Sequence, residues 1–124
     1  MVYVDGYVLC VPKKNLTAYK KMATAAGKIW MKHGALKYVE CVGQDMAPNM
    51  GGMKILTFPR LAKPKANEKV LFSFIVYESR AHRDSVNKKV MKIMMNDNTK
   101  KKDMQMPFDI KRMAYGGFES IVDI

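Results

Sequence analysis

Residues 70–95 read VLFSFIVYESRAHRDSVNKKVMKIMM and contain a strand, a boundary and a helix. The run from Val70 to Tyr77 is almost unbroken Val, Leu, Ile, Phe and Tyr, the β-branched and aromatic residues that favour a strand. Alternate residues of a strand point to opposite sides of a sheet, and both sides are mostly apolar here. Both faces of the predicted sheet therefore need a cover.

A helix is predicted directly after this strand. The hydroxyl of Ser79 can accept a hydrogen bond from a free backbone N–H of the first helical turn. Apolar residues then recur at helical spacing at Val86, Val90, Ile93 and Met94. The side-chain pattern repeats every two residues in the strand and about every 3.6 residues in the helix, and this change marks the boundary between the two elements.

Three further strands and one further helix are predicted around this stretch. The strands are Val2 to Val11, Leu36 to Val42 and Lys111 to Val122, and Gly116–Gly117 within the last indicates a bulge or the close approach of another backbone. The other helix begins at Asn15 as its N-cap and ends at Gly34 as a left-handed cap.

Two irregular connections complete the chain. Residues 43–68 contain several Pro and Gly residues and resemble a flap, and residues 96–107 form a polar loop rich in Lys and Met. The element order is β-α-β-β-α-β, which predicts an α+β ferredoxin-like sandwich over residues 1–124 as a single domain. Two helices cover one face of a four-stranded antiparallel sheet in that fold.

The other face of the predicted sheet stays open, and a homodimer would cover it. Apolar side chains on strands are expected on this second face, so that two sheets pack together in a symmetric dimer. The residues that we assign to it are Tyr3, Tyr7, Leu9, Ile75 and Tyr77.

Composition indicates a soluble protein. No stretch approaches the roughly 18 apolar residues of a membrane span, and the N-terminus alternates like a strand instead of resembling a secretory signal, so we expect no membrane contact and a cytoplasmic location.

The formal net charge of +11 would attract anionic partners. Its lysines are spread along the chain with only four arginines and no aromatic platform, which argues against nucleic-acid binding, although lysine-driven binding stays an alternative. Cys10 and Cys41 lack metal or redox spacing and are read as reduced core thiols.

Four segments resemble the YbaA-like family of small uncharacterised bacterial proteins. They are YVDGYVLCVPKKNLTAYKKMA (3–23), KHGALKYVEC (32–41), FSFIVYESRAHRDSVNKKVM (72–91) and MPFDIKRMAYGGFESIVDI (106–124), of which the last is the most specific. The resemblance covers nearly the whole chain. It implies a dimeric α+β barrel made from two sheets, and it implies no activity.

A ligand pocket is expected between the sheet and the helices. Its candidate residues are mostly aromatic, as a flat aromatic or quinone-like ligand would require, although aromatic residues on such faces are usually core. They are Trp30, Tyr19, Tyr77, Arg112 and Tyr115. Arg112 is further expected to form an ion pair with Asp5 or Glu40, because an unpaired charge among apolar neighbours is costly.

His82 and Asp5 are the candidate catalytic bases, and a capping or solvated role is the alternative for His82. His33 fits a structural role near the end of the first helix. Two histidines on separate helices make a poor metal site, so no metal and no cofactor are expected.

The leading functional hypothesis is therefore a dimeric α+β barrel protein that binds a small hydrophobic or aromatic molecule between sheet and helices. The alternatives are a cofactor-free monooxygenase or isomerase acting on a quinol- or polyketide-like substrate, and lysine-driven nucleic-acid binding.

Overall fold

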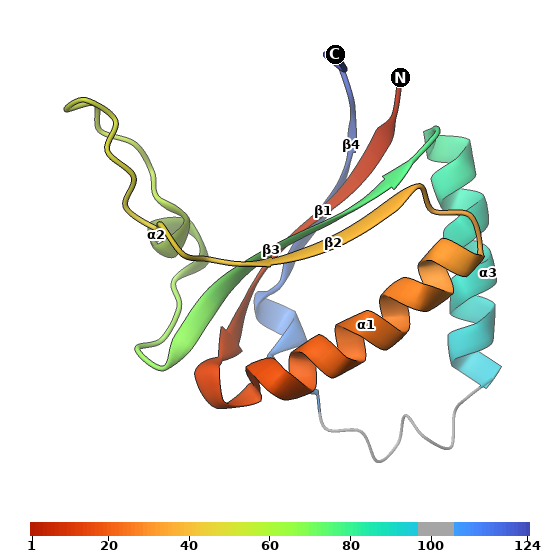
Figure 1. Cartoon of the computed structure of the whole chain (residues 1–124), viewed down its shortest axis with the longest axis horizontal. Helices are drawn as coiled ribbons and strands as arrows, with labels where there is room; N and C mark the ends of the chain where they lie inside the picture. Colours follow the sequence, from red (N-terminus) through yellow and green to blue (C-terminus); the bar gives the residue numbers. More distant parts are fainter. Residues whose placement is uncertain (97–105) are drawn as a thin grey trace.

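Four antiparallel strands form one sheet in the computed structural model, which describes residues 1–96 and 106–124. Helices α1 and α3 both lie on one side of this sheet (Figure 1). The predicted β-α-β-β-α-β order is confirmed, and the strands lie side by side in the order β2-β3-β1-β4. The elements are β1 (Tyr3–Pro12), α1 (Leu16–Lys32), β2 (Lys37–Val42), β3 (Glu68–Tyr77), α3 (Arg80–Asn96) and β4 (Ala114–Glu119).

The three predicted helix boundaries are confirmed in position. Ser79 Oγ accepts a hydrogen bond from the backbone N–H of His82 at 3.1 Å, and Gly34 has a left-handed φ of 115° after α1. Asn15 also stands at the N-cap position of α1, as predicted, but its side chain makes no capping hydrogen bond. A 3₁₀ turn, η1 (Lys13–Asn15), precedes α1, and the Asn15 side-chain amide donates to the carbonyl of Pro107 at 3.0 Å. That long-range bond takes the side chain away from the helix end.

The last strand is shorter than predicted and contains no bulge. A 3₁₀ turn, η2 (Ile110–Arg112), occupies the first part of the predicted strand. Gly116 and Gly117 pair in regular register with Gly6 and Asp5. The close approach at Gly117 comes from side chains rather than from a backbone, because a Cβ atom there would lie 2.6 Å from Nη2 of Arg83.

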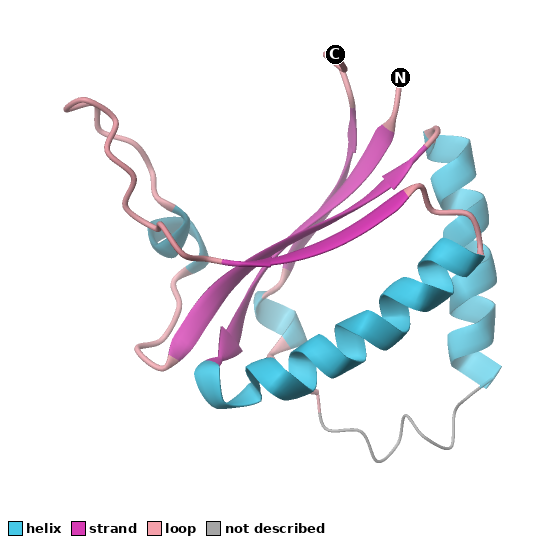
Figure 2. Ribbon diagram, viewed as in Figure 1, coloured by secondary structure: helices cyan, strands magenta, loops and turns pink. Residues whose placement is uncertain are grey.

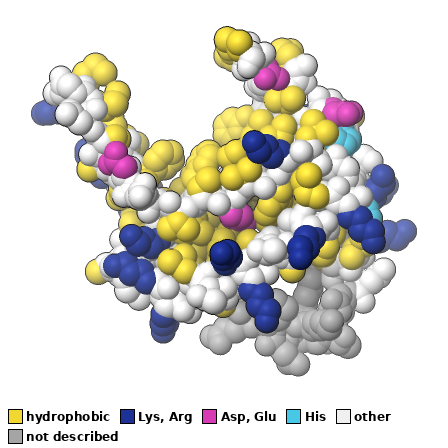
Figure 3. All heavy atoms as spheres, viewed as in Figure 1, with side chains coloured by type: hydrophobic (Ala, Val, Ile, Leu, Met, Phe, Trp, Pro, Cys, Tyr) yellow, Lys and Arg dark blue, Asp and Glu magenta, His cyan; other side chains and the backbone are white. Residues whose placement is uncertain are grey.

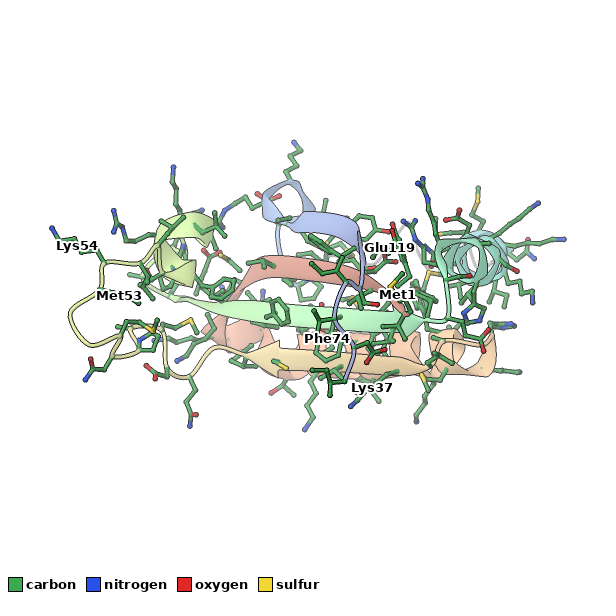
Figure 4. The ribbon with its side chains drawn as sticks, turned by 90° about the horizontal axis from the view of Figure 1, so that it is seen from above. Met1, Lys37, Met53, Lys54, Phe74 and Glu119 are labelled. Carbon is green, nitrogen blue, oxygen red and sulfur yellow. The ribbon has the colours of Figure 1, made fainter. Side chains whose placement is uncertain are left out.

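The predicted assignment of sheet faces is wrong. The side chains expected on the open face, among them Leu9, Ile75 and Tyr77, are buried on the face that α1 and α3 cover. Strand alternation separates two sets of residues without saying which set meets the helices. The open face instead carries Val4, Val8, Phe72, Phe74, Val76 and Phe118, and Figure 4 looks onto this face, with Phe74 near its middle.

Residues 43–67, which we call the flap, leave the sheet on the side opposite to α1 and α3 (Figure 2). The flap contains a short helix, α2 (Phe58–Ala62), whose first turn is capped by Thr57 Oγ1 accepting from the backbone N–H of Arg60 at 3.4 Å. Lys63 ends α2 with a left-handed φ of 53°. Most of the predicted 96–107 loop lies outside the described residues.

Candidate functional site

A cavity of about 590 Å³ lies between the helix-facing side of the sheet and the helices α1 and α3. We call it the sheet–helix cavity. Its lining is mostly hydrocarbon, methionine and aromatic side chains with a few polar groups, a composition typical of small-molecule sites. The residues are Tyr7, Leu9, Tyr19, Met22, Ala23, Ala26, Ile29, Trp30, Tyr38, Glu40, Ser73, Ile75, Ile93, Met94, Met106, Phe108 and Met113. Val39 and Phe74 also border the cavity, although strand alternation places their side chains on the open face.

A second space of about 1040 Å³ lies along the outer side of the first helix, between α1 and the edge strand β2. We call it the α1–β2 groove. Lys20, Lys28 and Lys32 of α1 contribute to its lining, and Figure 3 shows hydrophobic side chains between basic side chains on this side of the molecule. Four residues line both the groove and the sheet–helix cavity, so the two spaces share a wall: Tyr19, Ala23, Tyr38 and Glu40.

Three side chains of this shared wall form a hydrogen-bonded group. The hydroxyl of Tyr19 donates to Glu40 Oε1 at 2.7 Å, and the hydroxyl of Tyr38 donates to Glu40 Oε2 at 2.8 Å. Burial and the neighbouring Glu40 carboxylate together raise the pKa of both phenols far above the usual value. Both tyrosines therefore stay protonated and act as donors to Glu40 at any physiological pH.

Glu40 belongs to a polar row across the floor of the cavity. Ser73 on β3 is the register partner of both Tyr7 on β1 and Glu40 on β2, and all three side chains face the helices. The row extends to Tyr115 on β4, whose ring stacks on that of Tyr7 with centroids 4.8 Å apart. Apart from this row, the cavity is lined almost entirely by apolar groups.

Asp5 is completely buried beside this floor, on the same face of β1 as Tyr7. Its Oδ1 lies 3.4 Å from Nε of Arg83, but the two groups are not aligned as a hydrogen bond. Within the described residues neither oxygen of Asp5 accepts one. Desolvation raises the pKa of Asp5, although the positive charge of Arg83 opposes this rise. A buried carboxylate is costly, and the nearby side chains of Tyr115, Asn87 and Tyr77 join Arg83 in offsetting part of that cost.

Asn87 on α3 connects the cavity wall to the surroundings of Asp5. Its side-chain oxygen accepts from Nε1 of Trp30 at 3.1 Å and from the hydroxyl of Tyr77 at 3.2 Å. Its side chain also lies close enough to Asp5 to lower the pKa of that carboxyl. Asn87 was not among the predicted site residues, although its spacing from Val86 and Val90 places it on the buried side of the helix.

The residues predicted for the pocket are only partly brought together. Tyr19 and Trp30 line the sheet–helix cavity, whereas Tyr77 and Tyr115 do not. Tyr77 shares the hydrogen-bond acceptor Asn87 with Trp30, and the ring of Tyr115 stacks on that of Tyr7. His82 lines neither space. Its Nδ1 accepts from the backbone N–H of Glu78 at 2.9 Å, and its ring meets the edge of the Tyr77 ring at 5.9 Å.

The ion pair predicted for Arg112 is wrong. Arg112 lies in η2 and contacts Glu68 through both terminal nitrogens, at 2.8 Å and 2.9 Å, and it donates to the carbonyl of Lys63 at 3.0 Å. Asp5 is paired with Arg83 instead. Glu68 is the first residue of β3 and pairs with the last residue of β1, and η2 lies at the same end of the sheet. Arg112 is therefore near Glu68, whereas Asp5 and Glu40 lie further along their strands.

Across residues 1–96 and 106–124, no group of three or more His, Cys, Asp and Glu side chains is arranged to hold a metal ion. Within the same ranges, no helix combines the length and the apolar character needed to cross a membrane.

Comparisons with known proteins identify a family and give no activity. The profile of the family described as "Protein of unknown function (DUF1428)" matches residues 2–110. The chain is 42% identical over 123 residues to "Uncharacterized protein YbaA" of Escherichia coli (strain K12), covering 99% of both chains. The same identity and coverage hold for the Shigella flexneri protein of that name. The solved structure "De novo designed protein Foldit4" aligns with a TM-score of 0.46 and 7% identity, over 97% of this chain and 99% of its own.

Proposed function

The chain belongs to the family described as "Protein of unknown function (DUF1428)", and we propose its function from the geometry of the cavity because that description assigns no activity. The proposed function is the binding of a small aromatic or hydrophobic molecule in the sheet–helix cavity. The observation that carries the proposal is the cavity itself. Its volume of about 590 Å³ falls within the range of about 300–1,000 Å³ typical of ligand sites. A concave, largely apolar space with a few polar groups is the form that small-molecule sites usually take.

The lining also suits an adaptable aromatic site. Trp30 and Phe108 offer ring surfaces, while Met22, Met94 and Met113 can change rotamer at little cost and fit irregular ligands. A site of this kind accepts a range of flat molecules and derives its selectivity from a few polar groups.

Native mass spectrometry of the purified protein tests this proposal. We expect a discrete added mass that dissociates under denaturing conditions and identifies the chemical class of the ligand. A matched pair of variants localises it. Ala26 lines the cavity and its neighbour Ala25 is exposed on the same helix, so Ala26→Phe should remove the added mass and Ala25→Phe should retain it. An added mass that survives Ala26→Phe would place the ligand elsewhere and contradict the proposal.

The protein would act as a homodimer joined through the open face of the sheet. Phe72 and Phe118 remain 42% and 61% exposed on this face. Large apolar side chains that are exposed together on one face mark interaction surfaces. The flap and the C-terminal end extend from the sheet on the same side (Figure 1). Both also expose apolar residues: Met53, Leu56, Leu61, Ile121 and Val122. A second copy offers the same apolar surfaces in a two-fold arrangement. Both cysteines are free; Cys10 is buried as predicted, whereas Cys41 is exposed, so its predicted place in the core is wrong.

A second candidate function is proton transfer to or from the ligand, as in a cofactor-free isomerase or oxygenase. The observation in its favour is Asp5, a completely buried carboxylate whose pKa is raised by desolvation. Asp5 does not itself line the sheet–helix cavity, but it shares a face of β1 with Tyr7, which does. Such a base exchanges the acidic C–H protons of an enolisable ketone with solvent. We expect the protein to accelerate exchange of the α-protons of 2-tetralone in D₂O, and Asp5→Asn to abolish this acceleration. An unchanged rate in that variant would remove Asp5 as the base.

A further inference from the structure

Glu40 is the only carboxylate among the described residues that line the sheet–helix cavity. We propose that Glu40 is the polar anchor of this cavity and that the ligand carries a hydrogen-bond donor, such as the hydroxyl of a phenol. This inference rests on the proposed function, because it names the chemistry by which the same cavity selects its ligand.

The hydrogen bonding of Glu40 leaves capacity for a ligand. An ionised carboxylate can accept about four hydrogen bonds, and Glu40 accepts one at each oxygen, from Tyr19 and Tyr38. Those two bonds fix the position of the carboxylate in the wall between the cavity and the α1–β2 groove. A carboxylate held in this way is a preorganised acceptor that faces an apolar space.

The same geometry selects against other ligand classes. The carboxylate repels an anionic ligand, and the described lysines near this wall, Lys20, Lys28 and Lys32, line the groove and not the cavity. A purely apolar ligand would cover Glu40 and strip it of water without replacing the lost hydrogen bonds. A neutral aromatic molecule with one hydroxyl satisfies both requirements, since its ring meets the apolar lining and its hydroxyl meets the carboxylate.

The floor of the cavity reinforces this choice. Ser73 and Tyr7 continue the polar row from Glu40, so a ligand hydroxyl at Glu40 lies beside further hydroxyl groups rather than against hydrocarbon. The phenols of Tyr19 and Tyr38 are the only side-chain donors recorded to Glu40 among the described residues, so its carboxylate keeps lone pairs for a ligand donor. Sites built around a buried polar partner discriminate strongly between a ligand that has the matching hydroxyl and one that lacks it.

Calorimetric titration with 2-naphthol and 2-methoxynaphthalene tests the inference. The two probes share the ring system, but only 2-naphthol has a donor. We expect the wild-type protein to bind 2-naphthol at least about tenfold more tightly, the size of effect typical of a hydrogen bond to a charged group. Equal affinity for the two probes would overturn the assignment of Glu40 while leaving the cavity as a binding site. Binding of neither probe would contradict the proposed function itself.

Two variants localise the preference. Glu40→Gln removes the charge and should reduce the ratio of the two affinities towards one, whereas Asp45→Asn removes an exposed carboxylate of the flap and should leave it unchanged. A preference that persists in Glu40→Gln would assign the donor contact to another group. The comparison of the two probes on wild-type protein needs no variant, so it stands even if Glu40→Gln fails to fold.

Discussion

Gly27 of α1 and Tyr38 of β2 are in direct contact, because a Cβ atom at position 27 would lie 2.7 Å from Cδ1 of the Tyr38 ring. Only a residue without a side chain lets the helix approach the sheet this closely. Tyr38 in turn donates to Glu40, so the missing side chain of Gly27 helps to place the polar anchor of the cavity.

Gly27→Ala should therefore destabilise the protein, although alanine is ordinarily the better helix former by about 1 kcal/mol. The displaced ring causes overpacking, for which we expect a net loss of about 1–3 kcal/mol in the free energy of unfolding by urea denaturation. The same substitution in a Tyr38→Ala background should become stabilising, because the ring is gone. If alanine stabilises both backgrounds, Gly27 does not position Tyr38.

Asp5→Asn should stabilise the protein at neutral pH. Burial raises the folded-state pKa of Asp5 above 3.8, so the stability linked to this group is complete below pH 3.8 and is lost as the pH rises through the folded-state value. Melting temperatures of variant and wild type should therefore diverge as the pH rises from 4 to 8, with the variant the more stable. A variant less stable at pH 8 would mean that Asp5 and Arg83 form a stabilising structural pair.

Arg112→Gln should weaken the attachment of the flap in a pH-dependent manner. Hydrogen bonds from Arg112 lower the pKa of Glu68, so the stability linked to Glu68 is present above pH 4.5 and is lost as the pH falls below that value. Limited proteolysis should cleave the variant faster within residues 43–67 at pH 7, and the difference should diminish at low pH. Equal cleavage at pH 7 would show that Arg112 does not hold the base of the flap.

Phe72→Glu should convert a dimer into a monomer, because it places a charge at the centre of the proposed interface. Light scattering after size-exclusion chromatography should give twice 14.1 kDa for the wild type and 14.1 kDa for the variant. Met91→Glu alters an exposed apolar residue of α3, on the other side of the sheet, and should leave the dimer intact. A monomeric wild type would contradict the proposed interface.

The sequence predicted the parts of the fold that depend on local chemistry. The strand and helix of residues 70–95, the cap at Ser79 and the left-handed Gly34 follow from period, hydroxyl chemistry and backbone freedom. The long-range partners did not follow, because Asn15 and Arg112 find Pro107 and Glu68 only after the chain has folded.

The candidate site likewise has residues that were predictable from the sequence and residues that were not. Trp30 and Tyr19 were identifiable as aromatic residues on the buried side of a helix, and both line the cavity. The group formed by Tyr19, Tyr38 and Glu40 depends on the register between β2 and β3 and on the close approach of α1 at Gly27. Neither is encoded in residue spacing along the chain, so Glu40 was read only as a charge in need of a cation.

The binding of an aromatic molecule in the sheet–helix cavity can be tested most directly at Trp30, the only tryptophan of the chain. Its side chain lines the cavity and its indole N–H donates to Asn87, so the single indole signal of a ¹⁵N-labelled sample reports on this wall of the cavity. Titration with 2-naphthol should shift this signal saturably with one ligand per chain, in Ala25→Phe as in the wild type, and should leave it unmoved in Ala26→Phe. An indole signal that does not respond in the wild-type protein, or that responds equally in Ala26→Phe, would contradict the account.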